Sequence, residues 1–134
     1  MPRSLLVAAS ALLLSACAMP PPHSCAPPLK PAIQVDLFFG RDTPKGEVSD
    51  AEWATFLNDE VTSRFPAGLT VLDAAGQFRE PSGRLVRERS KLVVVVVFDA
   101  PAHRPKVEAL VDVYNKRFGQ HGVFRSERPV CAGM

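Results

Sequence analysis

Several absences from the sequence limit what this protein can do. No apolar run approaches the roughly 20 residues that a membrane-spanning helix needs, and a formal net charge of only +2 gives no overall electrostatic case for nucleic acid as a partner. The histidines are scattered, and neither Cys-x-x-Cys nor His-x-x-x-His spacing occurs, so we expect no metal site. A Gly-x-Ser-x-Gly motif and a glycine-rich phosphate loop are also missing, and no cofactor is predicted.

The amino-terminal segment, residues 1–16, has the order of a bacterial signal peptide. A single positive charge precedes a largely apolar run from Leu5 to Leu14, which is too short to cross a bilayer. The tetrad from Leu14 to Cys17 resembles the lipobox, which implies acylation of the Cys17 sulfur and cleavage before it. We therefore expect a lipid-anchored protein in the bacterial cell envelope that faces the periplasm. An ordinary secretory signal with an accidental cysteine is the alternative.

Prolines dominate residues 17–31, which are predicted to form an extended tether. At about 3.1 Å per residue, this tether would hold the domain roughly 40 Å from the lipid. With Cys17 acylated, Cys25 in the tether and Cys131 near the carboxyl terminus remain. Such an even pair in an oxidising periplasm favours a disulfide, with two free thiols as the alternative.

Hydrophobic periodicity predicts that residues 32–134 form a single α+β domain. The predicted elements are, in order, strand 32–39, helix 49–63, strand 69–79, strand 84–98, helix 105–118 and strand 123–130. This order is typical of a ferredoxin-like sandwich, in which an antiparallel sheet carries two helices on one face. The same topology pairs the first strand with the last, and Cys25 and Cys131 flank their neighbouring ends. The topology thus favours the disulfide independently of the cysteine count.

Local signals mark the element boundaries. Ser49 is a suitable N-cap for the first helix, and Glu52 completes a capping box. Gly119 is the natural stop of the second helix, and residues 40–48 are predicted to form a loop. Ala75 and Gly76 interrupt the second strand, which predicts a β-bulge or a close backbone approach there.

The run from Leu92 to Phe98 places large apolar side chains on both faces of its strand. Helices cover only one face of a ferredoxin-like sheet, so the other face would expose an apolar patch, to which Phe38 contributes. We therefore expect a homodimer through the open face of the sheet. A carboxyl-terminal or hairpin segment that folds back over this face is the monomeric alternative.

A row of cations is the best candidate for a binding site. These residues alternate along one strand and therefore share one face of it: Arg87, Arg89 and Lys91. With Arg79 across the hairpin and Asp36 on the first strand, they form a candidate anion-binding site for a carboxylate or phosphate. The alternative is a solvated hairpin face on which Glu80 and Glu88 pair with the cations.

The residues themselves resemble domain-of-unknown-function family 3574, which comprises small bacterial exported proteins and lipoproteins. The most distinctive string runs from Arg84 to Lys91, and Phe78 stands where tryptophan is expected in relatives. The resemblance implies no reaction or substrate. The matching stretches are Asp36–Gly40, Val48–Phe65, Gly68–Phe78, Gly83–Val97 and Tyr114–Cys131.

The expected function is that of a non-enzymatic binding or interaction domain, whose partner is an unknown envelope component or a second copy of the chain. We predict no catalytic residue, because Glu60 and Arg64 have the i, i+4 spacing of a helical ion pair. The alternative is a small enzyme or ligand carrier of the dimeric ferredoxin-like type, with a pocket between two sheets. A sizeable cavity that contains a buried charged group would favour this alternative over a flat, solvated sheet.

Overall fold

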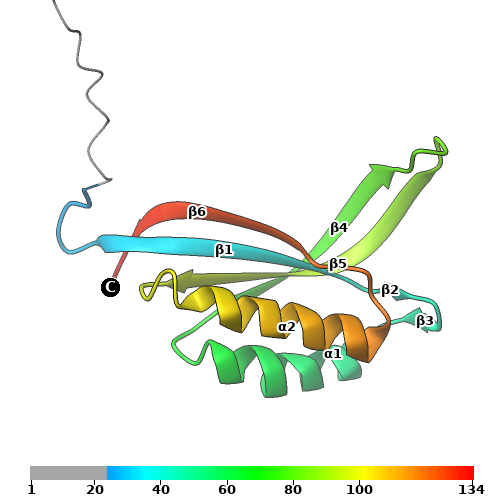
Figure 1. Cartoon of the computed structure of the whole chain (residues 1–134), viewed down its shortest axis with the longest axis horizontal. Helices are drawn as coiled ribbons and strands as arrows, with labels where there is room; N and C mark the ends of the chain where they lie inside the picture. The colour runs from blue at the N-terminus through cyan, green and yellow to red at the C-terminus, as the bar shows by residue number, and fades with distance from the viewer. Residues whose placement is uncertain (1–23) are drawn as a thin grey trace, which may run out of the picture.

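Figure 1 shows the computed structural model, which describes residues 24–134. The predicted signal peptide, Cys17 and the first part of the tether lie outside the described residues. An antiparallel sheet has the strand order β4-β5-β1-β6. Its strands are β1 (Lys30–Gly40), β4 (Thr70–Arg79), β5 (Leu85–Val97) and β6 (Phe124–Ala132).

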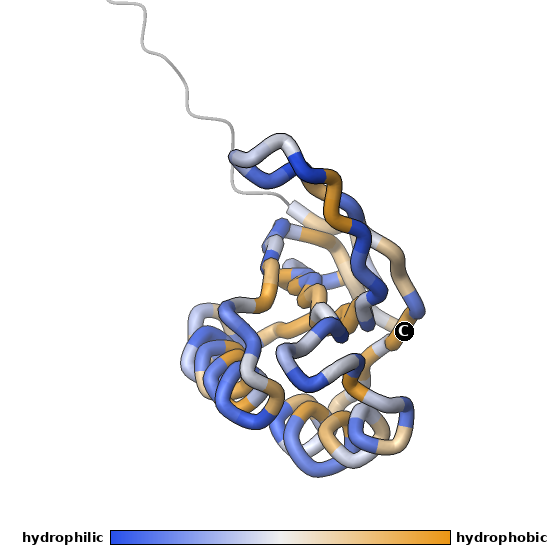
Figure 2. The backbone as a smooth tube through the Cα atoms, turned by 90° about the vertical axis from the view of Figure 1, so that its right-hand side faces the viewer, coloured by the Kyte–Doolittle hydropathy of each residue, from blue (hydrophilic) through white to orange (hydrophobic). Residues whose placement is uncertain are grey.

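Both helices lie on one face of this sheet (Figures 1 and 2). Helix α1 (Asp50–Phe56) continues directly into a π-helical segment, η1 (Leu57–Thr62), and α2 (His103–Phe118) covers the rest of the face. This arrangement confirms the predicted ferredoxin-like α+β sandwich. Among residues 24–134, no helix is long and apolar enough to cross a membrane.

The hydrophobic core fills the space between the sheet and the helices. Phe39 of β1 is fully buried at its centre, and its ring lies 4.8 to 5.6 Å from those of Trp53, Phe56 and Tyr114. Such tilted and edge-on ring pairs add stability beyond the burial of apolar area. The odd-numbered residues of β1 and β5 supply the floor of this core: Val35, Leu37, Val93, Val95 and Val97.

The predicted helix boundaries rest on caps that the structure contains. Ser49 Oγ accepts a hydrogen bond from Glu52 N at 3.2 Å, and the Glu52 carboxylate accepts one from Ser49 N at 2.8 Å. The Ser49 hydroxyl also donates to a Glu52 carboxylate oxygen at 2.6 Å, and this hydrogen bond, together with that from Ser49 N, lowers the pKa of Glu52. At the other end of the helical layer, Gly119 ends α2 in the left-handed conformation that suits glycine. The spacing of the apolar residues fits an α-helix and a π-helix alike. The change from α1 to η1 could therefore not be predicted from the sequence.

The segment predicted as a loop contains a small hairpin of β2 (Asp42–Thr43) and β3 (Gly46–Glu47). The expected β-bulge is wrong, because β4 and β5 pair in continuous register through Ala75 and Gly76. Strand β1 begins at Lys30, within the segment predicted as tether. A disulfide between Cys25 and Cys131 joins the chain just before β1 to β6, where the predicted topology placed it.

The ribbon of β4 and β5 projects beyond the helical layer at one end of the molecule (Figure 1). No described element covers the opposite face of the sheet. Neither predicted covering segment folds back over it, because β6 is an edge strand and the hairpin continues the sheet. Leu72, Phe78 and Phe124 are therefore exposed on this open face, and Asp36 lies there too, 3.2 Å from Arg128 Nη1.

Candidate ligand-binding cleft

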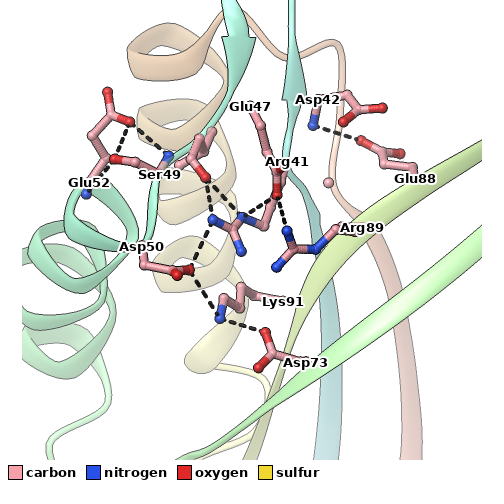
Figure 3. Close-up of polar contacts among 12 residues, drawn as sticks. Arg41, Asp42, Glu47, Ser49, Asp50, Glu52, Asp73, Glu88, Arg89 and Lys91 are labelled. Carbon is pink, nitrogen blue, oxygen red and sulfur yellow. Dashed lines mark hydrogen bonds and ion pairs between the residues drawn. The ribbon is translucent and has the colours of Figure 1, made fainter.

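The predicted cationic row lies on the helix-side face of the projecting ribbon. Lys91 Nζ lies 2.5 Å from an Asp73 carboxylate oxygen and 3.8 Å from one of Asp50, while Arg89 Nη1 lies 3.2 Å from one of Glu47 (Figure 3). Hydrogen bonding and the charge of Lys91 hold the pKa of Asp73 below its usual range.

Only Arg87 of the row has no carboxylate partner among residues 24–134. An anion at this row would therefore compete with the protein's own carboxylates for Arg89 and Lys91.

The other residues predicted for this site lie elsewhere. Asp36 is on the opposite face of the sheet, and the Arg79 guanidinium donates to the carbonyl oxygen of Gly83. Glu80 pairs with Arg84 rather than with the row. Glu88, the second acid proposed as a partner, points to the open face with the other even-numbered residues of β5.

A buried arginine that the sequence analysis missed organises the helix-side cluster. Arg41 is 3 % exposed, and it donates through Nε and Nη2 to the carbonyl oxygen of Val48. Its guanidinium also lies 3.3 Å from a Glu47 carboxylate oxygen and 2.9 Å from one of Asp50 (Figure 3). Arg41 thereby ties the β2–β3 hairpin to the start of α1. This cluster is structural, since its charges pair internally.

On the open face, Glu88 rests against the backbone at the end of β1. Its Oε1 accepts a hydrogen bond of 3.4 Å from Asp42 N (Figure 3). A side chain at Gly40 would displace the Glu88 carboxylate from its present position, so glycine leaves room for this close approach. Burial raises the pKa of Glu88, and the neighbouring Asp42 carboxylate raises it further. Among residues 24–134, Glu88 forms no ion pair.

Gly40 is fixed from the core side as well. The Tyr114 hydroxyl of α2 donates a hydrogen bond of 2.7 Å to the carbonyl oxygen of Gly40. Tyr114 is buried in the aromatic core, and this burial raises the pKa of its hydroxyl. The segment that supports Glu88 is therefore hydrogen-bonded to a residue of the buried aromatic core.

A cleft of about 500 Å³ opens beside Glu88, where the ribbon leaves the body of the sheet. Phe38, Phe78 and Phe124 form its apolar walls, and the rings of Phe38 and Phe124 lie 5.6 Å apart at 56°. Gly76 pairs with Glu88 across the ribbon and leaves the floor open, because a Cβ there would meet no atom within 4 Å. The polar lining comes from Gln77, Ser90 and Gln120.

The cleft combines an apolar interior with few polar groups, which is the usual composition of a small-molecule site. Sequence analysis considered Glu88 only as an ion-pair partner and Phe38 only as part of a dimer face. No group of three or more potential ligands for a metal ion occurs among residues 24–134.

A family model described as "Protein of unknown function (DUF3574)" matches residues 34–134. No curated protein matches the sequence. A phage SAM lyase in complex with S-methyl-5'-thioadenosine has a similar structure, with a TM-score of 0.55 and 18 % identity over 75 % of this chain and 90 % of that one. The phage SAM lyase in its apo state gives a TM-score of 0.57 and 16 % identity over 77 % and 86 % of the two chains. At this identity the likeness concerns the fold alone.

Proposed function

Because the chain belongs to the DUF3574 family of proteins of unknown function, we propose its role from the cleft itself: it is an envelope lipoprotein whose domain binds a small organic ligand beside Glu88. The observation that carries this proposal is a carboxylate without an ion pair among the described residues, which lines a cavity of about 500 Å³ together with three phenylalanines. Cavities of roughly 300 to 1,000 Å³ with few polar groups are typical of small-molecule sites.

The energetic cost of this arrangement supports the proposal. The phenyl rings of Phe78 and Phe124 are 54 % and 71 % exposed, and an ionised Glu88 is partly withdrawn from water without a cation beside it among residues 24–134. Each feature forgoes stability that burial or pairing would supply. Binding sites commonly retain such costs, because a ligand that covers the rings and pairs with the carboxylate recovers the lost free energy.

A small enzyme is the second candidate, since the same cleft can hold a substrate beside the Glu88 carboxylate. The fold is shared with a phage SAM lyase that was solved with S-methyl-5'-thioadenosine, a small organic molecule. This likeness supports binding of a small molecule by the fold, and it carries no reaction over to this chain.

The binding proposal can be tested by NMR on the mature protein exported without acylation. We expect benzyl alcohol or S-methyl-5'-thioadenosine to shift the amide signals of Gly76, Gln77, Gln120 and Gly122 in a saturable way. Replacing Gly76 with valine should fill the cleft and abolish these shifts without strain, since no atom lies near the added Cβ. Ala75→Val adds the same side chain to the opposite face and is the matched control. Shifts spread over the surface, or unchanged in Gly76→Val, would refute the proposal.

The lipid anchor is tested separately. We expect Cys17→Ala to abolish membrane retention, because residues 24–134 contain no helix that could span a membrane and the short proline-rich tether would not hold the domain there. Fractionation of labelled cells measures this against the unaltered protein. A variant that still pellets with membranes after a high-salt wash would show that Cys17 is not the anchor.

A further inference from the structure

The charge around the cleft indicates what kind of ligand it takes, provided that the cleft binds one as proposed above. Glu88 is the charged residue on its lining, and Asp42 lies next to it. The nearest cations along β5, Arg87 and Arg89, project from the other face of the ribbon. An anionic ligand would therefore meet repulsion from Glu88 and Asp42 without a cation of the cleft to offset it.

The walls of the cleft favour positive charge as well. A phenyl ring carries partial negative charge on its face and attracts a cation that lies within about 6 Å of its centre. The tilt of 56° between Phe38 and Phe124 makes a corner, and Phe78 on β4 contributes a third ring to the same cleft. Aromatic rings that line a cleft together with a carboxylate form the kind of site that binds methylated or other substituted ammonium groups.

One hydrogen-bonding side chain of the cleft is already used within the protein. The Gln120 amide donates to the carbonyl oxygen of Asp42 and so holds the segment that supports Glu88. Ser90 remains on the lining as a neutral group that can contact the polar part of a ligand, whereas the Gln77 side chain lies on the other face of the ribbon with Arg87. The one charged contact that the cleft offers is therefore the Glu88 carboxylate.

We propose that the cleft binds an organic cation, a protonated or quaternary amine with an apolar substituent, whose charge pairs with Glu88 and whose body packs on Phe38, Phe78 and Phe124. Glu88 sets the sign of the ligand's charge, and the rings set its apolar character. Gly40 positions the carboxylate, and Gly76 leaves room for the substituent.

Calorimetric titration with three probes of similar size tests this inference: benzyltrimethylammonium, benzyl alcohol and phenylacetate. For the unacylated mature protein we expect benzyltrimethylammonium to bind about tenfold more tightly than benzyl alcohol, and phenylacetate to bind more weakly than both. Glu88→Gln keeps the shape of the site and should remove most of the preference for the cation while benzyl alcohol still binds. Glu80→Gln, which removes an acid from the hairpin turn outside the cleft, is the matched control and should leave all three affinities unchanged.

The outcomes separate this inference from the proposal on which it rests. If the cation and the alcohol bind equally, and Glu88→Gln changes neither, the cleft is a binding site but not one for cations. If none of the probes binds and Gly76→Val makes no difference, both the inference and the proposed function are wrong. Loss of cation binding in Phe78→Ala, with the fold retained by circular dichroism, would further support the role of the rings.

Discussion

The two faces of the sheet carry similar apolar residues, but one face packs against the helices and the other is open. Phe38 and Phe39 are neighbours in β1, yet Phe39 is fully buried among three aromatic rings of the core, whereas Phe38 forms a wall of an open cleft. Along β5, the valines alternate between the same two environments. Apolar character alone therefore does not distinguish the face that stabilises the fold from the face that is available to a ligand.

The charged groups show the same contrast. On the helix side, Arg41, Arg89 and Lys91 pair with acids of β3, α1 and β4, so that each of these three cations already has an acidic partner. On the open side, Glu88 forms no ion pair within the described part of the chain, and its surroundings raise its pKa. Arg41, Arg89 and Lys91 thus already have acidic partners, whereas Glu88 has no cation beside it among residues 24–134.

The largest expected effect comes from placing the same charge on either face of β5. Val95→Glu puts a carboxylate where the side chain is 1 % exposed and should cost more than about 4 kcal/mol, enough to unfold a marginally stable domain. Val96→Glu lies on the open face and should cost less than about 1 kcal/mol. Circular dichroism with urea unfolding of the exported, unacylated protein measures both. Equal losses would contradict the assignment of the two faces.

The sequence could predict the fold because its signals are local and mutually consistent. Alternation along β1, the capping box at Ser49 and the stop at Gly119 each appear in the structure as expected. The cleft could not be predicted in the same way. It depends on where Gly76 comes to lie opposite Glu88, and on how Gly40 and Phe124 are brought beside them, and these are consequences of strand register.

One sequence signal did point towards the cleft. The interruption at Ala75 and Gly76 allowed either a bulge or a close backbone approach, and the structure shows neither of these at Gly76 but an open floor. Arg41 was missed for a different reason, because nothing in a predicted loop indicates that a charged side chain will be buried.

The second largest effect on stability is expected from removal of the disulfide. The disulfide ties β6 to the start of β1 across a sequence separation of 106 residues. Replacing both cysteines with serine should lower the free energy of unfolding by about 2 to 5 kcal/mol, because the unfolded chain regains entropy. Urea unfolding measures the loss, and mass spectrometry of peptides cut without reduction checks the bond. Recovery of Cys25 and Cys131 as free thiols from fresh periplasm would refute the pairing in the native protein.

A smaller effect is expected on self-association. We propose that the mature domain forms a dimer through the part of its open face that lies outside the cleft, because Leu72, Val94 and Val96 would otherwise stay uncovered there as an apolar patch. Val96→Glu, which leaves the fold intact, should then shift the protein towards the monomer in sedimentation experiments at tens of micromolar. Thr62→Glu on the outer surface of η1 is the control. Unaltered protein that sediments as a monomer would rule the dimer out.

The smallest expected effect is a change in melting temperature at neutral pH, and its sign differs between the two faces of the sheet. The pKa of Glu88 is higher in the folded state than in the unfolded state, so ionisation of this group destabilises the fold. Its contribution to stability is fully present below the unfolded pKa of about 4.3. This contribution is lost as the pH rises through the folded pKa. Glu88→Gln should therefore raise the melting temperature slightly at neutral pH, and the gain should vanish in acid.

Asp73 on the helix side provides the comparison, because Lys91 lowers the pKa of its carboxyl group. The contribution of Asp73 to stability is therefore present above the unfolded pKa and is lost as the pH falls through the folded pKa. Asp73→Asn should accordingly lower the melting temperature slightly at neutral pH and have no effect in acid. Thermal unfolding from about pH 3 to about pH 8 measures both variants against the unaltered protein. A Glu88→Gln variant that is less stable at neutral pH would show that its carboxylate serves the fold, as Asp73 does, and is not held ready for a ligand.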